Sequence, residues 1–429
     1  MASDKKEYDV FKGLLSGDQV NTLESETILA CVAEKSLSDL GSADLVYVLH
    51  DPCDIRKPYA SDMEDLGTVL SLQKAVVKGY SSFNSVAVTP DKQQVHLLSS
   101  TVYSNTQANY VSQEHLHLIE SDTSKIAVLR NKKGNQVKEE ERALVLADTY
   151  RNGAKIAQQQ ISESSILLKR DQPGRLVCHV LDREFDDEAV FEQVEALRDS
   201  FVIRLKLNRL SNETQAVYTP KGKISTKIKY IKLIDKQFAH QADFLIEKLD
   251  IKGKIYPQVN CLVEWEKLSI SGKSYTVLRI TLSCGGQALF QHPMLLLTNR
   301  VIENADQARQ VYKTYILRFK IEVIFRFLKQ NMGWETFQVR DFNAIANLLA
   351  LAFFLVGYFK ELEEELTKHP LASFLCKLAL SKGKITVFFL LQGLEKLIGY
   401  QEVIQWMKQE NITHQQVTEL IDELGLQKQ

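Results

Sequence analysis

The 429-residue sequence has only six cysteines, eight prolines and almost no net charge. The cysteines are scattered and contain no C-x-x-C pair, which argues against a zinc site and a disulfide framework and favours a reducing compartment. Lys and Arg number 53 against 54 Asp and Glu, so a globally basic coat protein is excluded. Because 45% of the residues are hydrophobic, intrinsic disorder is excluded as well.

Several functional motifs are also missing. There is no G-x-x-x-x-G-K-[ST], G-x-G-x-x-G or G-x-S-x-G pattern, which argues against ATP hydrolysis, dinucleotide binding and α/β-hydrolase chemistry. The first residues lack the pattern of a secretory signal. One uncharged stretch, 342–359, is barely long enough to span a membrane, and Asn343 and Asn347 interrupt it. We therefore predict a fully buried core helix there and a soluble, cytoplasmic protein without membrane contact.

The order of strand-like and helix-like segments predicts an α/β fold. Three runs between residues 43 and 104 have the composition of short strands and predict an antiparallel meander. Residues 141–160 predict one helix, 175–182 a buried strand, 187–200 an amphipathic helix and 201–207 a further strand. This succession is typical of a mixed sheet with helices on its faces.

Residues 208–292 interrupt that order with short β-like runs and glycine turns, and we interpret them as a β-rich insertion. Nine basic side chains against two acidic ones make residues 201–236 a candidate phosphate-contacting surface, although a lysine-rich, solvated strand edge is an equally simple reading. The nine are Arg204, Lys206, Arg209, Lys221, Lys223, Lys227, Lys229, Lys232 and Lys236.

A helix predicted over residues 312–330 has one ordered polar stripe. At about 100° per residue, Arg318, Glu322, Arg326 and Lys329 fall within roughly 60° of Tyr315. Apolar side chains fill the opposite face; they are Ile316, Leu317, Ile321, Val323, Ile324, Phe327 and Leu328. A carboxylate among cations suits a site that grips a polyanion, but a surface helix with i,i+4 ion pairs would have the same pattern.

Two predicted strands end in an aspartate that is followed by polar, arginine-bearing sequence. These are Asp51 and Asp182, and with Glu322 they supply three carboxylates. Hard oxygen ligands of this kind suit Mg²⁺, and a pair of such ions can promote phosphoryl transfer. His50, beside Asp51, could either line this site or face the sheet.

Tyr315-x2-Arg318-x3-Glu322-x6-Lys329 resembles the Y-R-E-K signature of bacterial insertion-sequence transposases of the DDE type, the insertion-sequence-four group. HDPCDIRKPYASDMEDLG and VLDREFDD resemble the blocks around that family's two catalytic aspartates, and the resemblance spans roughly residues 44–358. It implies a DNA transposase with an RNase H-like mixed sheet, flanking helices and a β-rich insertion. By the same resemblance, Asp51, Asp182 and Glu322 would be catalytic and hold two Mg²⁺ ions, with Mn²⁺ as the expected substitute.

The resemblance also implies DNA contacts. Tyr315, Arg318 and Lys329 would contact phosphates at the element ends, and the helical stripe adds Arg326. The remaining DNA-binding candidates are Arg183, Lys221, Lys223, Lys227 and Lys229. Trp265 matches a base-stabilising tryptophan of some relatives, although a core tryptophan is the simpler interpretation.

The sequence departs from the family pattern at several positions. Glu184 adds a carboxylate beside Asp182, Asp54 competes with Asp51 for the first catalytic position, and the N-terminal segment is short and acidic. Two alternatives therefore stay open: a non-catalytic DNA-binding relative, and an RNase H-like nuclease without strand transfer. The expected partners are double-stranded DNA and a second copy of the chain. The two copies would contact each other through the C-terminal helices, and the protein would act at the bacterial nucleoid.

We predict five segments along the chain. Residues 1–43 form a short helical segment, and 44–207 form the first part of the catalytic core. The insertion occupies 208–296, the second core part with the Glu-bearing helix 297–360, and a helical C-terminal segment 361–429.

Overall fold

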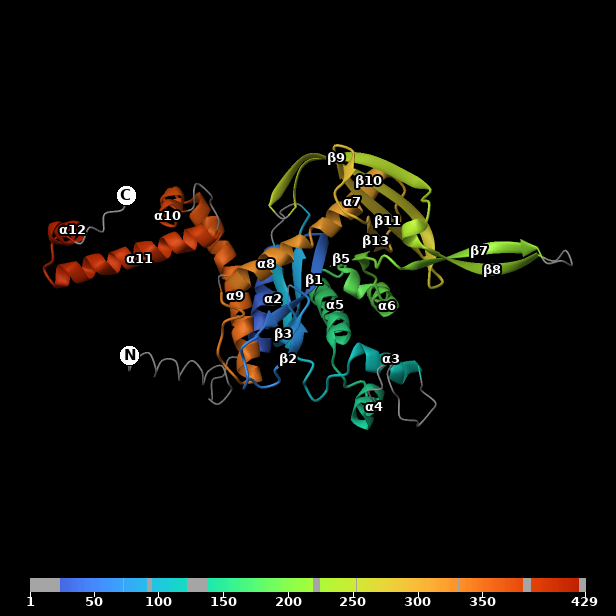
Figure 1. The fold of residues 1–429 in the computed structure, drawn as a ribbon, viewed down its shortest axis with the longest axis horizontal. Helices are drawn as coiled ribbons and strands as arrows, with labels where there is room; N and C mark the ends of the chain where they lie inside the picture. Colours follow the sequence, from blue (N-terminus) through green and yellow to red (C-terminus); the bar gives the residue numbers. More distant parts are fainter. Residues whose placement is uncertain are drawn as a thin grey trace. The chain divides into compact units, whose positions relative to one another are not determined.

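The structure is a computed structural model that describes residues 24–71, 73–90, 95–121, 137–218, 224–251, 253–330, 332–380 and 387–423. Contacts divide the chain into one unit of Met1–Phe354 and a second of Leu355–Gln429. All six cysteines lie within the described residues and are free, so the predicted lack of disulfides is confirmed. Figure 1 shows the fold.

The first unit is built on one eleven-stranded mixed sheet with flanking helices, which confirms the predicted mixed α/β class. Its path runs β2, β3, β1, β5, β6, β13, β11, β10, β9, with β4 beside β3 and β12 beside β11. The strands are β1 (Leu45–Arg56), β2 (Gly67–Leu70), β3 (Val76–Val88), β4 (Val95–Tyr103), β5 (Leu176–Leu181), β6 (Ser200–Arg204), β9 (His240–Ile251), β10 (Lys254–Ile270), β11 (Lys273–Cys284), β12 (Gln287–Ala288) and β13 (Met294–Thr298).

The predicted meander is confirmed: β3 is antiparallel to both β1 and β4. On its other side β1 is parallel to β5, and β5 is parallel to β6. Helix α6 (Glu188–Ala196) connects β5 to β6, as a parallel pair requires. β1 runs on past Asp51 to Arg56, so the prediction that this strand ends at Asp51 is wrong. Continued pairing with β3 extends it, since Asp51 lies opposite Asn84 and Arg56 opposite Gly79.

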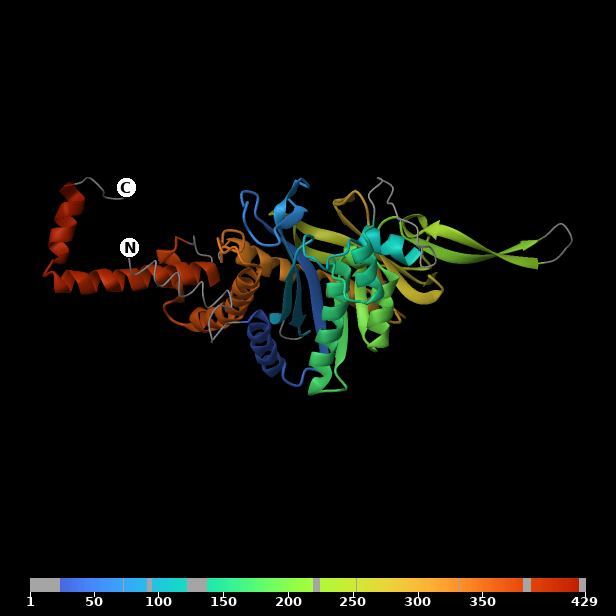
Figure 2. The same ribbon diagram turned by 90° about the horizontal axis from the view of Figure 1, so that it is seen from below.

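Most strands of the predicted insertion extend the same sheet. β13 pairs with β6, and β11, β10 and β9 follow in antiparallel order. Strands β7 (Leu210–Tyr218) and β8 (Ile224–Lys232) pair only with each other. Figures 1 and 2 both show this hairpin leaving the main sheet.

Side-chain alternation along β1 divides the flanking helices between the two faces of the sheet. Val46 and Val48 pack with Leu37 of α2 (Ser25–Leu40) and Leu168 of α5 (Gly153–Arg170). The odd-numbered residues of β1 face α7 (Ala305–Ile316) and α8 (Phe319–Gln330) instead: Gln310 Nε2 donates to the Tyr47 hydroxyl over 3.4 Å. The proposed catalytic residues therefore belong to the α7/α8 face.

The single helix predicted over residues 141–160 is wrong. The chain forms α4 (Glu139–Leu146) and α5, with a break between them. Asp148 has a φ of 54°, a left-handed value that ends the first helix. Asn152 then begins α5 by accepting a hydrogen bond from the Lys155 backbone N–H over 2.9 Å. Short helix α3 (Gln113–Ser121) packs beside α4.

Helix α9 (Phe342–Lys368) contains the uncharged stretch. Ala344, Ile345, Leu349 and Phe353 are buried, whereas Phe354 is 43% exposed, so the helix is not buried all round as predicted. In the described part of the chain, no helix is both long and apolar enough to cross a membrane.

The second unit contains the end of α9 and helices α10 (Ala372–Leu378), α11 (Val387–Gln409) and α12 (His414–Glu423). Leu375 and Cys376 of α10 pack with Leu390 of α11. A Cβ on Gly393 would lie 2.1 Å from the Leu375 carbonyl oxygen, so only glycine allows the two helices to approach this closely.

Candidate active site

Strand register brings Asp51 and Asp182 to the same level of the sheet. Leu49 of β1 pairs with Val180 of β5 in the parallel ladder. Asp51 and Asp182 each follow their paired residue by two positions, and residues two apart lie on the same face. Asp182 directly follows the end of β5 at Leu181. The sheet thus carries the two carboxylates side by side toward α7 and α8.

The helix predicted to carry the polar stripe is two helices in the structure. α7 ends at Ile316 and α8 begins at Phe319, with Leu317 and Arg318 forming a turn between them. The helical wheel is also wrong at two positions. Val323, which it placed on the apolar face, is 58% exposed, and Tyr315, which it placed on the polar stripe, is fully buried. An ideal wheel assumes an unbroken helix, and the turn at 317–318 removes that continuity.

Arg318 lies between two of the three candidate carboxylates. Its Nη1 is 2.8 Å from Asp51 Oδ1, and its Nη2 donates to Glu322 Oε1 over 2.5 Å. The Arg318 side chain is 6% exposed, the Asp51 side chain 11% and the Glu322 side chain 43%. The guanidinium is therefore enclosed, while Glu322 reaches solvent. The i,i+4 pair expected for a simple surface helix exists, but its arginine is buried against the sheet.

Asp182, the third carboxylate, has a different set of partners. The Tyr315 hydroxyl donates to Asp182 Oδ1 over 3.1 Å, and Arg204 Nη1 lies 3.9 Å from the same oxygen. Burial raises the pKa of Tyr315 to about 12, and the nearby Asp182 adds to the shift, so the phenol stays protonated as a donor. Tyr315 therefore holds Asp182 in place from inside the fold.

The three carboxylates interact electrostatically. Burial raises the pKa of Asp51 to about 7; Arg318 opposes this shift, whereas Glu322 and Asp182 add to it. Asp54, the alternative to Asp51, has other neighbours: its carboxylate accepts from Ser81 Oγ over 3.3 Å and from the Leu70 backbone N–H over 3.4 Å. Only Asp51 contacts the arginine that also holds Glu322.

Lys329, at the end of α8, is held against β1. Its ammonium group donates to the Asp54 carbonyl oxygen over 2.5 Å and lies 3.2 Å from Glu335 Oε1. Glu335 also binds Arg56 of β1 at 2.9 Å. Lys329 thus lies near the carboxylates but already has an acidic partner, which a phosphate would have to replace.

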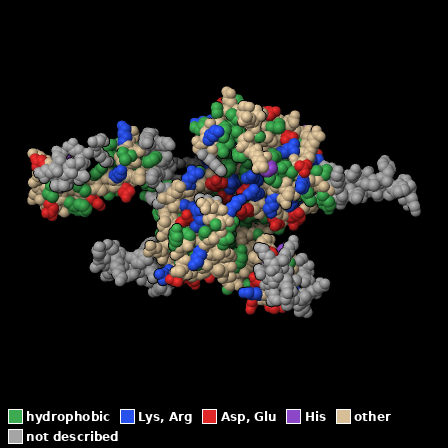
Figure 3. All heavy atoms as spheres, in the orientation of Figure 1, with side chains coloured by type: hydrophobic (Ala, Val, Ile, Leu, Met, Phe, Trp, Pro, Cys, Tyr) green, Lys and Arg blue, Asp and Glu red, His purple; other side chains and the backbone are tan. Residues whose placement is uncertain are grey.

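The remaining sequence-predicted DNA contacts are dispersed. Arg326 and Arg183 are exposed. Lys227 and Lys229 belong to β8, although the structure does not describe their side chains, and Lys221 and Lys223 lie outside the described residues. Figure 3 shows Lys and Arg side chains beside Asp and Glu side chains over the region where Figure 1 draws α7 and α8.

Two further cations of the basic stretch have acidic partners within the fold. Arg209 lies 3.3 Å from Asp186 and 3.2 Å from Glu188. Lys236 lies 3.6 Å from Glu266. These pairs support a structural role for Arg209 and Lys236.

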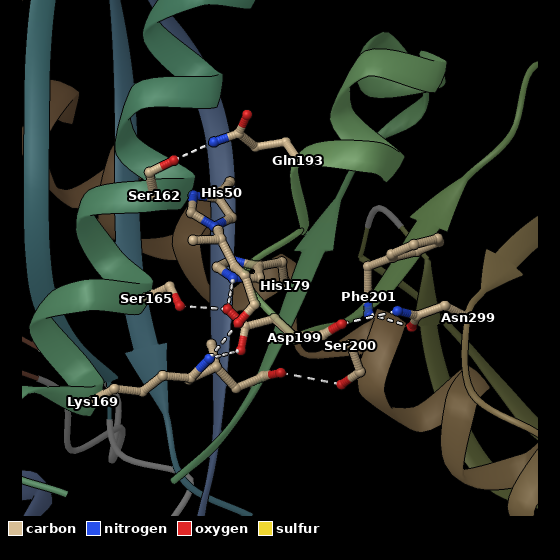
Figure 4. Close-up of polar contacts among 12 residues, drawn as sticks. His50, Ser162, Ser165, Lys169, His179, Gln193, Asp199, Ser200, Phe201 and Asn299 are labelled. Carbon is tan, nitrogen blue, oxygen red and sulfur yellow. Dashed lines mark hydrogen bonds and ion pairs between the residues drawn. The ribbon is translucent and has the colours of Figure 1, made fainter. Parts of the chain in front are cut away.

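A buried polar network supports the strands from the opposite face, and sequence reasoning missed most of it. His179 lies between His50, whose Nε2 is 2.9 Å from His179 Nδ1, and Asp199, whose Oδ2 is 3.2 Å from His179 Nε2. From α5, Ser165 and Lys169 each donate to Asp199 over 2.5 Å. Figure 4 shows these groups pointing toward one another between the strands and α5.

This network decides between the two interpretations of His50. His50 is fully buried and stacks on His179 at 5.2 Å, so it faces the sheet interior and does not line the carboxylate site. Burial lowers the pKa of His179, which favours the neutral ring. Because an ionised carboxylate only accepts hydrogen bonds, Nε2 of the neutral His179 donates to Asp199, and its Nδ1 is left to accept from His50. One histidine within each of the strands β1 and β5 was the available sequence signal for this network. No pattern in the sequence pointed to Asp199 or Lys169.

Two other predicted positions have local explanations. Trp265 is 6% exposed and stacks on His240 at 5.6 Å, which supports the interpretation as a core residue. Desolvation raises the pKa of Glu184, and the charges of Asp182 and Asp54 add to the shift. Glu184 therefore lies close enough to Asp182 for the two charges to interact.

The donor chemistry of the site fits a divalent cation. Three carboxylates with coupled charges are the hard oxygen ligands that Mg²⁺ prefers. Arg318 already occupies the position of a cation between Asp51 and Glu322. Within the described residues no three His, Cys, Asp or Glu side chains are grouped closely enough to hold a metal ion. The three carboxylates therefore have suitable chemistry for the ion, but the positions of Asp51 and Glu322 are those that their ion pairs with Arg318 stabilise.

One family of known proteins resembles part of this chain. Residues 165–356 match the model of a family described as the transposase DDE domain. The matched segment begins after Asp51 and contains both Asp182 and Glu322. No curated protein matches the chain. The large mixed sheet with its helices is consistent with a transposase domain of this family.

Proposed function

We propose that this protein is an insertion-sequence transposase of the Y-R-E-K group. It would cleave DNA at the element ends and join the freed 3′-hydroxyl to target DNA. The observation that carries the proposal is that Arg318 pairs with both Asp51 and Glu322, while the strand register places Asp182 level with Asp51. Residues 165–356 of the same chain match the transposase DDE domain. The strand order β4, β3, β1, β5, β6 supports an RNase H-like core.

Asp51, Asp182 and Glu322 would hold two Mg²⁺ ions. When bound, the ions activate the attacking oxygen and stabilise the leaving one. Tyr315 keeps Asp182 oriented through its hydroxyl, and the β1/β5 register keeps Asp51 level with Asp182. Arg318, Arg326 and Lys329 supply cations on one side of these carboxylates, where DNA phosphates would lie.

The test of this proposal uses a labelled duplex that carries the inverted repeats flanking the gene, with Mg²⁺ or EDTA. Wild type should nick at the repeat boundary only with Mg²⁺ and give joined products. Glu322→Gln should bind the duplex normally but cleave it about 10³-fold more slowly, because the swap keeps the shape and removes the metal-binding charge.

Glu303→Gln is the matched control, because Glu303 is exposed before α7 and lies outside the site. It should cleave like wild type. If the wild type and Glu322→Gln bind equally and neither cuts, the protein is a DNA-binding relative without catalysis. Cleavage without joined products would instead make it a nuclease.

The non-catalytic relative is the second candidate function. One observation favours it: in the described residues no group of three potential ligands is close enough for a metal, and Arg318 occupies the space. Such a protein would bind DNA through the same cations without cutting it. The Mg²⁺ dependence above separates the two candidates.

The β7–β8 hairpin is proposed to bind the DNA backbone. Lys227→Ala with Lys229→Ala should reduce the slope of log affinity against log salt by about 2, since each phosphate contact contributes about 0.9. The loss should be similar for unrelated duplex sequences. Fluorescence anisotropy over a range of salt concentrations measures the slope.

The matched control is Lys35→Ala with Lys155→Ala, whose ammonium groups pair with Asp39 and Asp148. It should leave the slope unchanged. Equal slopes for the hairpin variant and wild type would support the solvated strand edge instead.

Two element ends must be brought together before joining, so we also propose a homodimer, acting on DNA at the bacterial nucleoid. The second unit supports this proposal because α11 exposes Ile398, Val403, Ile404 and Trp406, whose side chains are between 45% and 61% exposed. Large apolar side chains gathered on one exposed helix are typical of an interaction surface.

A further inference from the structure

The Arg318 guanidinium is already paired with carboxylates of the protein itself. Its two terminal nitrogens contact Asp51 and Glu322, and its buried Nε finds no hydrogen-bond partner among the residues that the structure describes. The only ion pair that the described residues give Asp51 is the one with Arg318. Arg318 therefore neutralises a nearly buried carboxylate in the absence of any ion.

A divalent ion and this guanidinium cannot share the space between Asp51 and Glu322. Like charges a few ångströms apart repel strongly in a partly buried site. One oxygen of each carboxylate, Asp51 Oδ1 and Glu322 Oε1, is paired with Arg318, and an ion between these residues would draw its ligands from the same two carboxylates. An ion can bind there only after Arg318 has moved.

DNA offers Arg318 an alternative partner. A phosphate accepts paired N–H bonds from a guanidinium and would satisfy the donor that is now unused. Glu322 is 43% exposed, so the carboxylate side of this pair faces the surface where DNA would bind. If the Arg318 side chain moved from the carboxylates to a phosphate, it would keep an anionic partner. The carboxylates of Asp51 and Glu322 would then be free to bind a metal ion.

We propose that Arg318 is a resident counter-ion that blocks metal binding in the DNA-free protein and couples metal binding to DNA binding. This inference rests on the proposed function. DNA draws Arg318 away and opens the ligand set. Because such coupling is reciprocal, metal then strengthens DNA binding by the same factor. The device would prevent the metal-loaded site from forming before an element end is in place.

The test measures Mn²⁺ affinity directly, by calorimetric titration, and requires no catalysis. Wild type should bind Mn²⁺ at least tenfold more tightly with a duplex that ends at the repeat boundary in a 3′-deoxy terminus. Arg318→Gln without DNA should bind Mn²⁺ at least tenfold more tightly than wild type, and the duplex should then change its affinity less than about twofold.

Lys313→Gln is the matched control, because Lys313 is exposed near the end of α7 and the substitution removes the same charge. It should leave the DNA-free Mn²⁺ affinity within about twofold of wild type. Equal or weaker binding by Arg318→Gln would overturn the inference, and so would an equal gain in Lys313→Gln, which would indicate a general charge effect.

Arg318→Gln leaves Asp51 without its counter-ion and is expected to be less stable than wild type, so a second measurement uses thermal unfolding. Mn²⁺ should raise the thermal unfolding midpoint of this variant more than that of wild type, and an equal shift would count against the inference.

Asp51→Asn distinguishes failure of the Arg318 inference from failure of the proposed metal site. If wild type binds Mn²⁺ with duplex and Asp51→Asn does not, the metal site stands even where Arg318 fails. If no protein binds Mn²⁺ under any condition, the metal-dependent function fails too, and the inference with it.

Discussion

Replacing Asp51 by asparagine is expected to slow Mg²⁺-dependent cleavage by about 10³-fold, because a metal-binding charge contributes several kcal/mol to phosphoryl transfer. Asp51 lies level with Asp182 and shares Arg318 with Glu322. The variant should still fold and bind DNA, since Arg318 keeps its pair with Glu322. Cleavage rates on the inverted-repeat duplex, measured at saturating protein, test this expectation.

Asp54→Asn is the control that resolves the assignment left open by the sequence. Asp54 accepts hydrogen bonds from Ser81 and from the Leu70 backbone, and an asparagine oxygen can accept at least one of them. The variant should therefore cleave within about tenfold of wild type. Loss of cleavage in Asp54→Asn together with activity in Asp51→Asn would reverse the assignment of the first catalytic aspartate.

Replacing Asp199 by asparagine should lower the free energy of unfolding by about 3 kcal/mol. The Asp199 side chain is fully buried and accepts hydrogen bonds from Lys169, Ser165 and His179. Asparagine removes the charge and turns one acceptor into a donor that faces the Lys169 ammonium. Urea denaturation followed by circular dichroism measures the loss.

Asp171→Asn, at the exposed end of α5, is the matched control. Asp171 pairs with Arg170 at the surface and its side chain is 66% exposed, so Asp171→Asn should leave the denaturation midpoint close to that of wild type. An unchanged denaturation midpoint in Asp199→Asn would show that the network adds no stability.

The pH dependence supplies a second check on Asp199. Burial alone would raise the pKa of Asp199, but hydrogen bonds from His179, Lys169 and Ser165 hold it below the usual value. A lowered carboxyl pKa stabilises the fold above the unfolded pKa of about 3.9, and this contribution disappears as the pH falls through the folded pKa. The stability difference between wild type and Asp199→Asn should therefore be constant from pH 7 to about 5 and shrink below about 4.

Much of the fold was predictable because it depends on local periodicity. Strand-like runs predicted the β1, β3, β4 meander; β5 and α6 lie within the predicted segments, and β6 begins one residue earlier than predicted. Hydrophobic alternation is a property of neighbouring residues, so the sequence contains it directly. The spacing of Tyr315, Arg318, Glu322 and Lys329 likewise needed no structure to be recognised.

The errors have a common cause. β1 continues beyond Asp51 because β3 pairs with it, and the strands of the insertion join the main sheet because β13 pairs with β6. The break at Leu317 and Arg318 occurs where Arg318 reaches Asp51, far away in sequence. In each case a contact between distant segments decided the local conformation, and such contacts leave no periodic signal.

The sequence by itself determined the fold class, the candidate carboxylates and the cations around them, since residue type and spacing carry that information. Only the tertiary structure decided that Asp51 and Asp182 are level, that Arg318 bridges Asp51 and Glu322, and that Asp199 supports the strands through His179. Hydrogen bonds and ion pairs act over about 3 Å, and the chain brings those groups within reach only when it folds.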